Sequence, residues 1–257
     1  MLGWFADRLK HVVLEVQEYL RLLGQVGRAL VSRPVYGRDI VEQLDAIGLG
    51  SLTVVLLTGT FTGMVLALQS GMTLDQFGAR PVVGRLVSAS MVKELGPVLT
   101  ALMVTGRVGS GIAAELGSMM VTEQISALRA LGTDPVRKLV VPRVIAGVVM
   151  VPILTIIANA VGMVGGAIIS KFQLQVAYSV YWNNVVLGLY VEDLWMGIIK
   201  PIVLGFLIVS IACHVGLRTS GGTQGVGRAT TNAVVSASVA VLASDFLLTK
   251  LLITLLY

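Results

Sequence analysis

Two stretches of this sequence are long and apolar enough to cross a membrane, and they limit the possible folds more than any other feature. Residues 46–74 and 144–170 contain no charged side chain. A helix needs about 20 apolar residues to cross the hydrocarbon core of a bilayer. Only 13% of the whole chain is charged, against about 25% in ordinary soluble domains. We therefore expect an integral membrane protein folded as a single domain over residues 1–257.

The same criterion divides the chain into five spans. They are expected at residues 48–70, 85–106, 144–170, 194–216 and 232–254. The second span is the weakest, because Lys93 and Glu94 interrupt it and Pro97 follows. In the first span, Gly59 and Gly63 have the spacing of small residues at a close contact between two membrane helices. The predicted fold class is an all-α integral membrane protein.

The segment before the first span is predicted to form helices on the membrane surface. Between residues 4 and 30, apolar residues recur with helical spacing at Leu9, Val12, Val13, Val16, Leu20 and Leu23. Charged side chains lie between them, and Trp4 suits an anchor in the headgroup region. These charges argue against a cleavable signal peptide. Ser32–Pro34 ends this helix, and a second short helix at 38–46 leads into the membrane. We interpret 4–46 as interfacial helices, because no soluble domain follows on which they would pack.

Basic residues are distributed unevenly between the two ends of the spans. Thirteen of the 19 Lys and Arg residues precede the first span, separate the second from the third, or separate the fourth from the fifth. The loops at 71–84 and 171–193 hold only Arg80 and Lys171, with Arg85 at the membrane edge. Because cytoplasmic loops carry the excess of positive charge, we expect a cytoplasmic N-terminus and a periplasmic C-terminus. The net charge of +5 therefore needs no nucleic-acid partner to explain it.

A polar segment at residues 106–143 separates the second span from the third. It contains an apolar helical stripe formed by Val121, Ile125, Leu128 and Leu131. Thr122 is expected to cap the start of this short helix, with Glu123 in its first turn. Gly132 suits the left-handed position that ends a helix, and Asp134-Pro135 is typical of the start of the next one. This pattern favours an ordered helix over an ordinary cytoplasmic loop.

Lys93, Glu94, Lys200 and Asp245 lie well inside the predicted spans. Each costs about 3 kcal/mol or more if it faces lipid. At about 1.5 Å per residue, Lys93, Lys200 and Asp245 lie roughly 9–13 Å inside the outer ends of three different spans. They either line a common cavity open to the periplasm or form an ion-pair cluster that holds the helices together. Arg107 and Glu115 lie nearer the cytoplasm and are interpreted as a structural pair.

Other functional classes find little support in the sequence. Cys213 lies in an apolar run, and His11 and His214 are far apart, so we expect neither a disulfide framework nor a metal site. The segment Gly222–Ala229 resembles a phosphate-binding loop but lacks its Lys and its Ser/Thr and joins two spans, so we interpret it as a flexible cytoplasmic turn. No hydrolase motif occurs. We predict no catalytic residue and no cofactor, and any ATP would have to be hydrolysed by a partner.

The polar segment and the residues before it resemble a known family. The strings GRVGSGIAAELGSMMVTEQISALRALGTDPVRKLVVPR and LVSASMVKELGPVLTALMVTGR resemble the MlaE-type permeases, the membrane subunits of ABC transporters that work with MCE-domain proteins. The resemblance extends over most of the chain. It implies that residues 119–135 form a coupling helix, which docks in a groove of a cytoplasmic ATPase that binds the ATP. The residues implied in this contact are Glu123, Gln124, Ile125, Ala127, Leu128, Leu131, Gly132, Asp134 and Pro135.

The same resemblance implies a role for the intramembrane charges, which match charged positions around the lipid pathway of the family. Lys93 and Lys200 would attract the phosphate of a phospholipid, while Glu94 and Asp245 hold the lysines in place. The implied assembly is a homodimer with two ATPase subunits and a periplasmic ring of MCE-domain protein. It would lie in the inner membrane of a Gram-negative bacterium and maintain the lipid asymmetry of the outer membrane. The alternative function is an ion-coupled secondary transporter that uses the intramembrane charges. An intramembrane enzyme is a third possibility, for which the sequence offers no catalytic residues.

Overall fold

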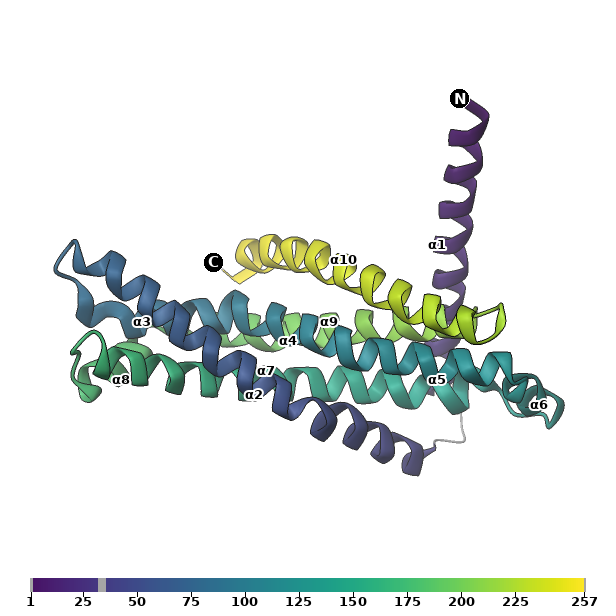
Figure 1. Cartoon of the computed structure of the whole chain (residues 1–257), viewed down its shortest axis with the longest axis horizontal. Coiled ribbons are helices and arrows are strands. Elements are labelled where there is room, and N and C mark those ends of the chain that lie inside the picture. The colour runs from purple at the N-terminus through teal and green to yellow at the C-terminus, as the bar shows by residue number, and fades with distance from the viewer. Residues whose placement is uncertain (1, 32–35, 257) are drawn as a thin grey trace.

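The computed structural model is a bundle of long helices with one helix projecting from its side (Figure 1). It describes residues 2–31 and 36–256. In the first helix, it describes side chains only for residues 10 and 13–30. The described residues contain no strand. Within residues 2–31 and 36–256, five helical stretches are long and apolar enough to span a membrane: Gly37–Asp75, Arg80–Val121, Val136–Phe172, Val191–Leu217 and Gly222–Leu256. The predicted all-α membrane fold with five spans is therefore confirmed.

Two of the spans are composite helices interrupted by π-helical turns. The second span runs through η1 (Arg80–Val82), α3 (Val83–Ser90), η2 (Met91–Leu95), α4 (Gly96–Val104), η3 (Thr105–Gly109) and α5 (Ser110–Val121). The third consists of η4 (Val136–Val140) and α7 (Val141–Phe172). Of these segments, η2, η3 and η4 are π-helical. Such turns occur frequently at functional sites, and here η2 contains Lys93 and Glu94 while η3 contains Arg107.

The remaining helices are α1 (Leu2–Val31), α2 (Gly37–Asp75), α6 (Gln124–Ala130), α8 (Tyr178–Leu187), α9 (Val191–Leu217) and α10 (Gly222–Leu256). Helix α2 is continuous, so no break separates residues 38–46 from the first span. The expected break at Ser32–Pro34 lies outside the described residues. The expected flexible turn at Gly222–Ala229 instead forms the first turns of α10, because the chain reverses at Gly221 and Gly222, which both have positive φ.

The first and third spans pack closely because small residues meet at their crossing. A Cβ atom on Gly63 would overlap the backbone of Gly162, and one on Gly59 would come within 2.8 Å of the carbonyl oxygen of Ala158. A Cβ on Gly165 would lie 2.5 Å from the carbonyl oxygen of Thr60. The contact predicted from the spacing of Gly59 and Gly63 is therefore present, and its partner is α7. No larger side chain fits between these backbones.

Helix α1 projects sideways from the bundle and attaches to it through its C-terminal half (Figure 1). The side chains of Leu22, Val26 and Ala29 are buried in the main hydrophobic core. Farther toward the N-terminus, the hydroxyls of Tyr19 and Ser210 lie 2.8 Å apart. Arg218 of the segment after α9 forms ion pairs with Glu15 and Glu18 at 2.8 and 2.6 Å. These polar contacts fix α1 to α9.

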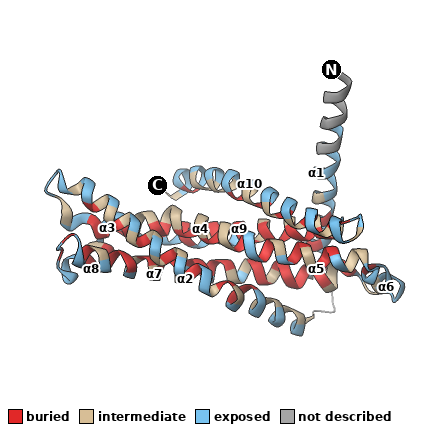
Figure 2. Cartoon of the chain, in the orientation of Figure 1, coloured by how far each residue is buried: buried red, intermediate tan, exposed pale blue. Residues whose placement is uncertain are grey.

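The predicted apolar stripe of α1 lies on a different face from its buried residues. Val13, Val16 and Leu20 are exposed, each by more than half of its surface. Leu23 is half-buried, whereas the side chains of Leu9, Val12 and Trp4 lie outside the described part of α1. Figure 2 shows the projecting helix as mostly exposed where its side chains are described. The stripe thus leaves an apolar surface on α1 that the residues described in the structure do not cover.

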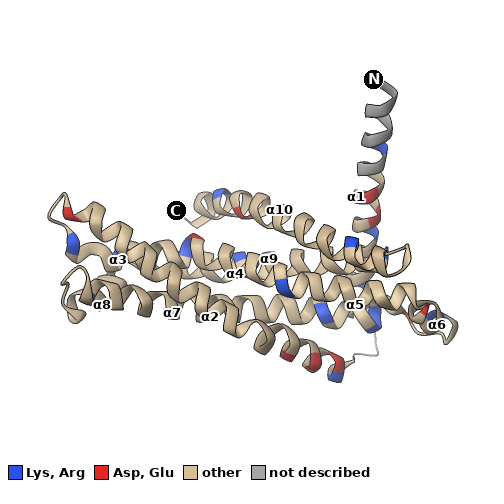
Figure 3. Ribbon diagram, in the orientation of Figure 1, with Lys and Arg blue, Asp and Glu red and all other residues tan. Residues whose placement is uncertain are grey.

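Charged residues gather near one end of the bundle (Figure 3). This end, formed by α6, the start of α2 and the start of α10, is called the α6 end. The opposite end, formed by α8 and the loop before α3, is called the α8 end. Between them the surface of the bundle is mainly uncharged, as a bilayer requires.

Candidate functional site

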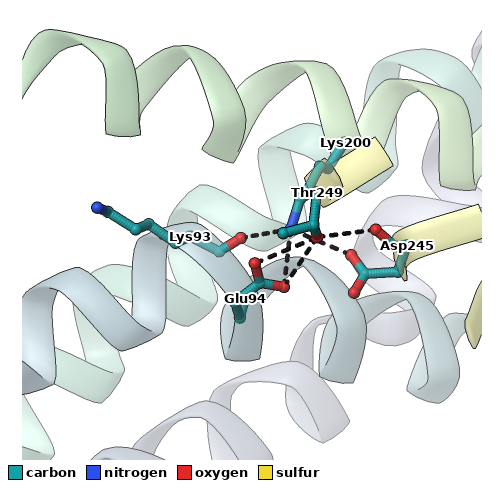
Figure 4. A network of polar contacts seen from close by, with 5 residues as sticks. All are labelled: Lys93, Glu94, Lys200, Asp245 and Thr249. Atoms are coloured by element: carbon teal, nitrogen blue, oxygen red, sulfur yellow. Dashed lines mark hydrogen bonds and ion pairs between the residues drawn. The ribbon is translucent and has the colours of Figure 1, made fainter. Parts of the chain in front are cut away.

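Three spans bring their intramembrane charges together, as Figure 4 shows. The ammonium of Lys200 on α9 lies 2.7 Å from Oε2 of Glu94 on η2 and 3.3 Å from Oδ1 of Asp245 on α10. The Lys200 side chain is completely buried, whereas the side chains of Glu94 and Asp245 keep 40% and 14% of their surface exposed. The meeting of charges expected from their similar depth is therefore present. We call Glu94, Lys200 and Asp245 the central cluster.

A proline explains why Lys200 also reaches the backbone of the second span. Pro97 has no N–H group, so the carbonyl oxygen four residues earlier, on Lys93, lacks its usual helical donor. The ammonium of Lys200 donates a hydrogen bond to this oxygen at 2.8 Å. The sequence contains this signal, since Pro97 follows Lys93 at the spacing that frees a carbonyl. The proline thus leaves a backbone oxygen of the second span free to accept a hydrogen bond from Lys200 of α9 inside the membrane.

The side chain of Lys93 points away from the central cluster (Figure 4). Its ammonium lies 2.7 Å from Oδ1 of Asp193, at the start of α9. The expectation that Glu94 and Asp245 hold both lysines is therefore wrong for Lys93. The reason is geometric: neighbouring residues on a helix point in different directions, so Lys93 cannot face the group that Glu94 faces.

Asp193 and Thr249 were missed in the sequence analysis. The carboxylate of Asp193 is fully buried and accepts a hydrogen bond from the backbone N–H of Tyr190 at 3.2 Å. This acid in the first turn of α9 is a helix-capping pattern that could have identified it. Thr249 lies one turn after Asp245 and donates to Glu94 at 3.2 Å. Its helical spacing from Asp245 was the available signal.

The accessibility of the two lysines determines what each can bind. Lys200 has no exposed surface, and its ammonium donates hydrogen bonds to the backbone oxygen of Lys93 and to Glu94 and forms an ion pair with Asp245. It therefore cannot receive a phosphate in this conformation. Lys93 keeps 32% of its side chain exposed, so it is the more accessible cation. The central cluster itself is a structural ion-pair network that opens to the surface through Glu94.

The polar segment between the second and third spans contains the predicted short helix. Helix α6 covers Gln124–Ala130 and ends at Gly132, which has a φ of 75°. The N–H of Gly132 donates to the carbonyl of Arg129, and the N–H of Thr133 to that of Leu128, both at 3.0 Å. These two bonds form a Schellman motif. The predicted end of the helix at Gly132 is confirmed.

The caps on either side of α6 agree with the sequence in part. The carboxylate of Asp134 accepts a hydrogen bond from the N–H of Val136 at 3.0 Å, as expected for the start of the next helix. The predicted N-cap at Thr122 is wrong. Glu123 occupies that position with a φ of 58°, and the Thr122 hydroxyl instead donates back to the carbonyl of Ser118 at 2.8 Å. The Thr122 hydroxyl therefore bonds to the backbone of the preceding helix α5 and does not cap α6.

The apolar stripe of the short helix does not form one docking face. Ile125 is 1% exposed and packs in the core of its own chain, whereas Leu131 is 80% exposed. Leu128 and Val121 are half-buried, and Pro135 is buried. The implied contact residues that remain exposed are Glu123, Gln124, Ala127, Leu131, Gly132 and Asp134. Ile125 and Pro135 thus position the helix, and the exposed residues face outward.

The expected pairing of Arg107 with Glu115 is also wrong. Glu115 forms an ion pair with Arg143 at 2.8 Å. Arg143 is buried and also donates to the carbonyl of Leu139 at 2.6 Å. Arg107 instead lies against α2, where a Cβ atom on Gly50 would be 3.3 Å from its Nη2. Among the described residues, no group of three or more His, Cys, Asp or Glu side chains has metal-binding geometry.

The family model described as Permease MlaE matches residues 40–251. The chain belongs to the MlaE permease family. A probable ABC transporter permease protein of Rickettsia bellii is 43% identical over 223 residues, which are 87% of this chain and 86% of the relative. The intermembrane phospholipid transport system permease protein MlaE of Haemophilus influenzae is 37% identical over 248 residues, 93% of this chain and 94% of the relative. The chloroplastic protein TRIGALACTOSYLDIACYLGLYCEROL 1 of Arabidopsis thaliana is 37% identical over 229 residues, 89% of this chain and 65% of the relative.

The part of the chain that matches the MlaE permease family contains both polar features of the fold. It begins in α2, includes α6 and the central cluster, and ends in α10. Helix α1 lies outside it. The family expected from the polar segment is therefore confirmed, and the protein is a multi-pass membrane permease.

Proposed function

We propose that this permease is the membrane subunit of an ABC transporter that moves phospholipids between the inner membrane and a periplasmic MCE-domain protein. The observation that carries the proposal is the match to the MlaE permease family over residues 40–251, together with the Haemophilus influenzae relative named for intermembrane phospholipid transport. In a Gram-negative cell this activity maintains the lipid asymmetry of the outer membrane. The subunit is not itself an enzyme.

The topology follows from the distribution of basic residues. The α6 end, which carries most of them, lies in the cytoplasm, and the α8 end lies in the periplasm. The N-terminus is then cytoplasmic and the C-terminus periplasmic. Helix α1 lies along the inner surface of the membrane, with Val13, Val16 and Leu20 toward the lipid. Its sideways projection from the bundle (Figure 1) and its exposed apolar face support this position.

Helix α6 is the coupling helix that contacts the partner ATPase. Its tip presents the exposed side chain of Leu131, while Ile125 and the Schellman motif at Gly132 hold it rigidly to the bundle. A rigid helix at a partner surface transmits a displacement instead of absorbing it. Motion driven by ATP therefore reaches the second and third spans, which flank α6 in the chain. Two permease subunits form a homodimer and bind two ATPase subunits.

Lipid recognition occurs around Lys93 and the central cluster. Lys93 is the accessible cation and contacts the phosphate, whereas Lys200 is held by Glu94 and Asp245 and positions the three spans. A lipid phosphate that binds Lys93 competes with Asp193 for the ammonium. This competition keeps the affinity moderate, so that the lipid can be released to the MCE-domain ring.

The test is ATP-dependent transfer of a fluorescent phospholipid between proteoliposomes and the MCE-domain protein, using the permease with its ATPase. Lys200→Ala and Asp245→Ala should each reduce the transfer rate at least ten-fold. Lys250→Ala, an exposed lysine of α10, is the matched control and should transfer normally. Full transport by both cluster variants would overturn the assigned site. Transport that ignores ATP but follows an ion gradient would instead identify a secondary transporter.

A further inference from the structure

The side chain of Arg107 has no hydrogen-bond or ion-pair partner among the residues that the structure describes. It projects from the π-helical turn η3, in the second span, and its side chain is exposed. Glu115, the nearest acid on the same composite helix, is already paired with Arg143 at 2.8 Å. The positive charge of Arg107 is therefore not compensated by the protein.

Arg107 lines a pocket between two spans. This pocket has a volume of about 220 Å³ and is lined by Gln43 and Ile47 of α2 and by Arg107, Gly111 and Glu115 of the second span. A Cβ atom on Gly111 would meet nothing within 4 Å, so the pocket is open beside Gly111. Because the charge of Glu115 is balanced by Arg143, the pocket keeps the single positive charge of Arg107.

The pocket lies at the boundary between the charged end and the apolar band. Asp45 is the last charged residue of α2 before an uncharged stretch of the helix. Gly50, which lies against Arg107, is five residues beyond it, or about 7.5 Å deeper. The neighbouring side chain of Leu49 is 69% exposed, as expected for a residue that faces lipid. This is the level at which lipid headgroups meet acyl chains.

An arginine at this level is expected to have an anionic partner. Leaving it without one at the surface of a span is unfavourable, and a guanidinium binds phosphate through two parallel hydrogen bonds. A phospholipid in the leaflet at the α6 end carries its phosphodiester at this depth. Its acyl chains would lie along the exposed apolar side chains of α2, including Leu49 and Leu57.

We propose that Arg107 and the pocket beside it bind the phosphodiester of a phospholipid in the leaflet at the α6 end. This site is separate from the central cluster: Lys93 is 14 residues away along the composite helix, or about 21 Å. It does not depend on the proposed transport function, because it concerns only binding in a membrane. Gly111 keeps the pocket open, and Gln43 supplies a further hydrogen-bond donor.

The experiment is native mass spectrometry of the full-length permease in detergent, titrated with dioctanoyl-phosphatidylglycerol. At lipid concentrations that saturate this site in the wild-type protein, Arg107→Gln should carry one lipid fewer per chain. The dissociation constant for that lipid should be at least ten-fold higher in the variant. Arg38→Gln is the matched control, because Arg38 lies at the same end, is water-exposed and is paired with Glu42. It should bind as wild type. Dioctanoylglycerol, which lacks the phosphate, should not occupy the site.

Gly111→Leu gives a second test that leaves Arg107 in place. A Cβ atom at this position meets nothing within 4 Å, so the leucine has room to enter the pocket and should also remove one bound lipid. This variant decides the result if Arg107→Gln does not fold. Equal lipid binding by wild type and the folded pocket variants would overturn the proposal. Inorganic phosphate that displaces the lipid at equal concentration would also overturn it, because the site would then select free phosphate.

Discussion

The ammonium of Lys93 lies 2.7 Å from the fully buried carboxylate of Asp193, although its sequence neighbour Glu94 contacts Lys200. Two adjacent residues of one π-helical turn therefore connect the second span to α9 at two separate points. The first contact is near the start of α9, and the second is at its Lys200, seven residues later. Together they fix both the rotation and the depth of α9 against the second span.

Replacing Asp193 by Asn is expected to weaken the fold. The variant keeps the shape of the side chain but leaves the Lys93 ammonium without its buried carboxylate, which costs about 2 kcal/mol. The midpoint of thermal unfolding in detergent should fall accordingly. The neighbouring Glu192→Gln removes the same charge from the next residue and should stay within about 0.5 kcal/mol of wild type. Equal stability of the two variants would contradict the assigned role of Asp193.

Replacing Lys200 by Met should be more harmful than replacing the whole central cluster. The single change leaves two carboxylates facing each other without a cation, and removing one partner of a buried pair costs about 3–5 kcal/mol. Adding Glu94→Gln and Asp245→Asn removes that uncompensated charge, so the triple variant should recover at least half of the lost stability. Thermal unfolding of the three purified proteins measures this. A triple variant less stable than Lys200→Met would argue against an ion-pair network.

Gly63→Ala is expected to disrupt the crossing of α2 and α7. A Cβ atom at this position overlaps the backbone of Gly162, and an overpacked core costs about 1–3 kcal/mol or more. Gly106→Ala is the control in another span, because a Cβ there meets nothing within 4 Å. That change should be neutral or stabilise the helix by up to about 1 kcal/mol. The yield of monodisperse protein and its unfolding midpoint distinguish the two.

Ile125 of α6 and Leu131, the residue that follows α6, are expected to have opposite effects when changed. Leu131→Glu alters an exposed side chain, so it should leave the stability of the permease unchanged while reducing co-purification of the ATPase at least ten-fold. Ile125→Ala opens a cavity in the core of the chain itself and should cost about 2–5 kcal/mol of stability. Pull-down with the ATPase and thermal unfolding together separate these effects. Normal ATPase binding by Leu131→Glu would refute the docking role of the tip.

Features governed by local chemistry were predictable from the sequence. The long apolar runs identified the spans, Gly132 identified the end of α6, and the depth of Lys200 and Asp245 placed them together. The partners of individual charges were not predictable, because they depend on the direction of each side chain. Lys93 and Glu94 diverge within η2, and no residue pattern announces that π-helical turn. Likewise, Arg143 reaches Glu115 only once the second and third spans are packed.

The crossing of Gly63 and Gly162 makes two of the five spans a fixed frame. With no side chains between the backbones, α2 and α7 have little room to slide past each other. In the most apolar 18-residue stretch of α10 only 11% of the residues are buried, so this helix is held by its polar contacts with Lys200 and Glu94 and not by a crossing of glycine backbones. A spin label on the exposed face of α7 therefore serves as a stationary reference point. Changes in its distance to a second label on α10 during ATP turnover would report the displacement of α10 alone.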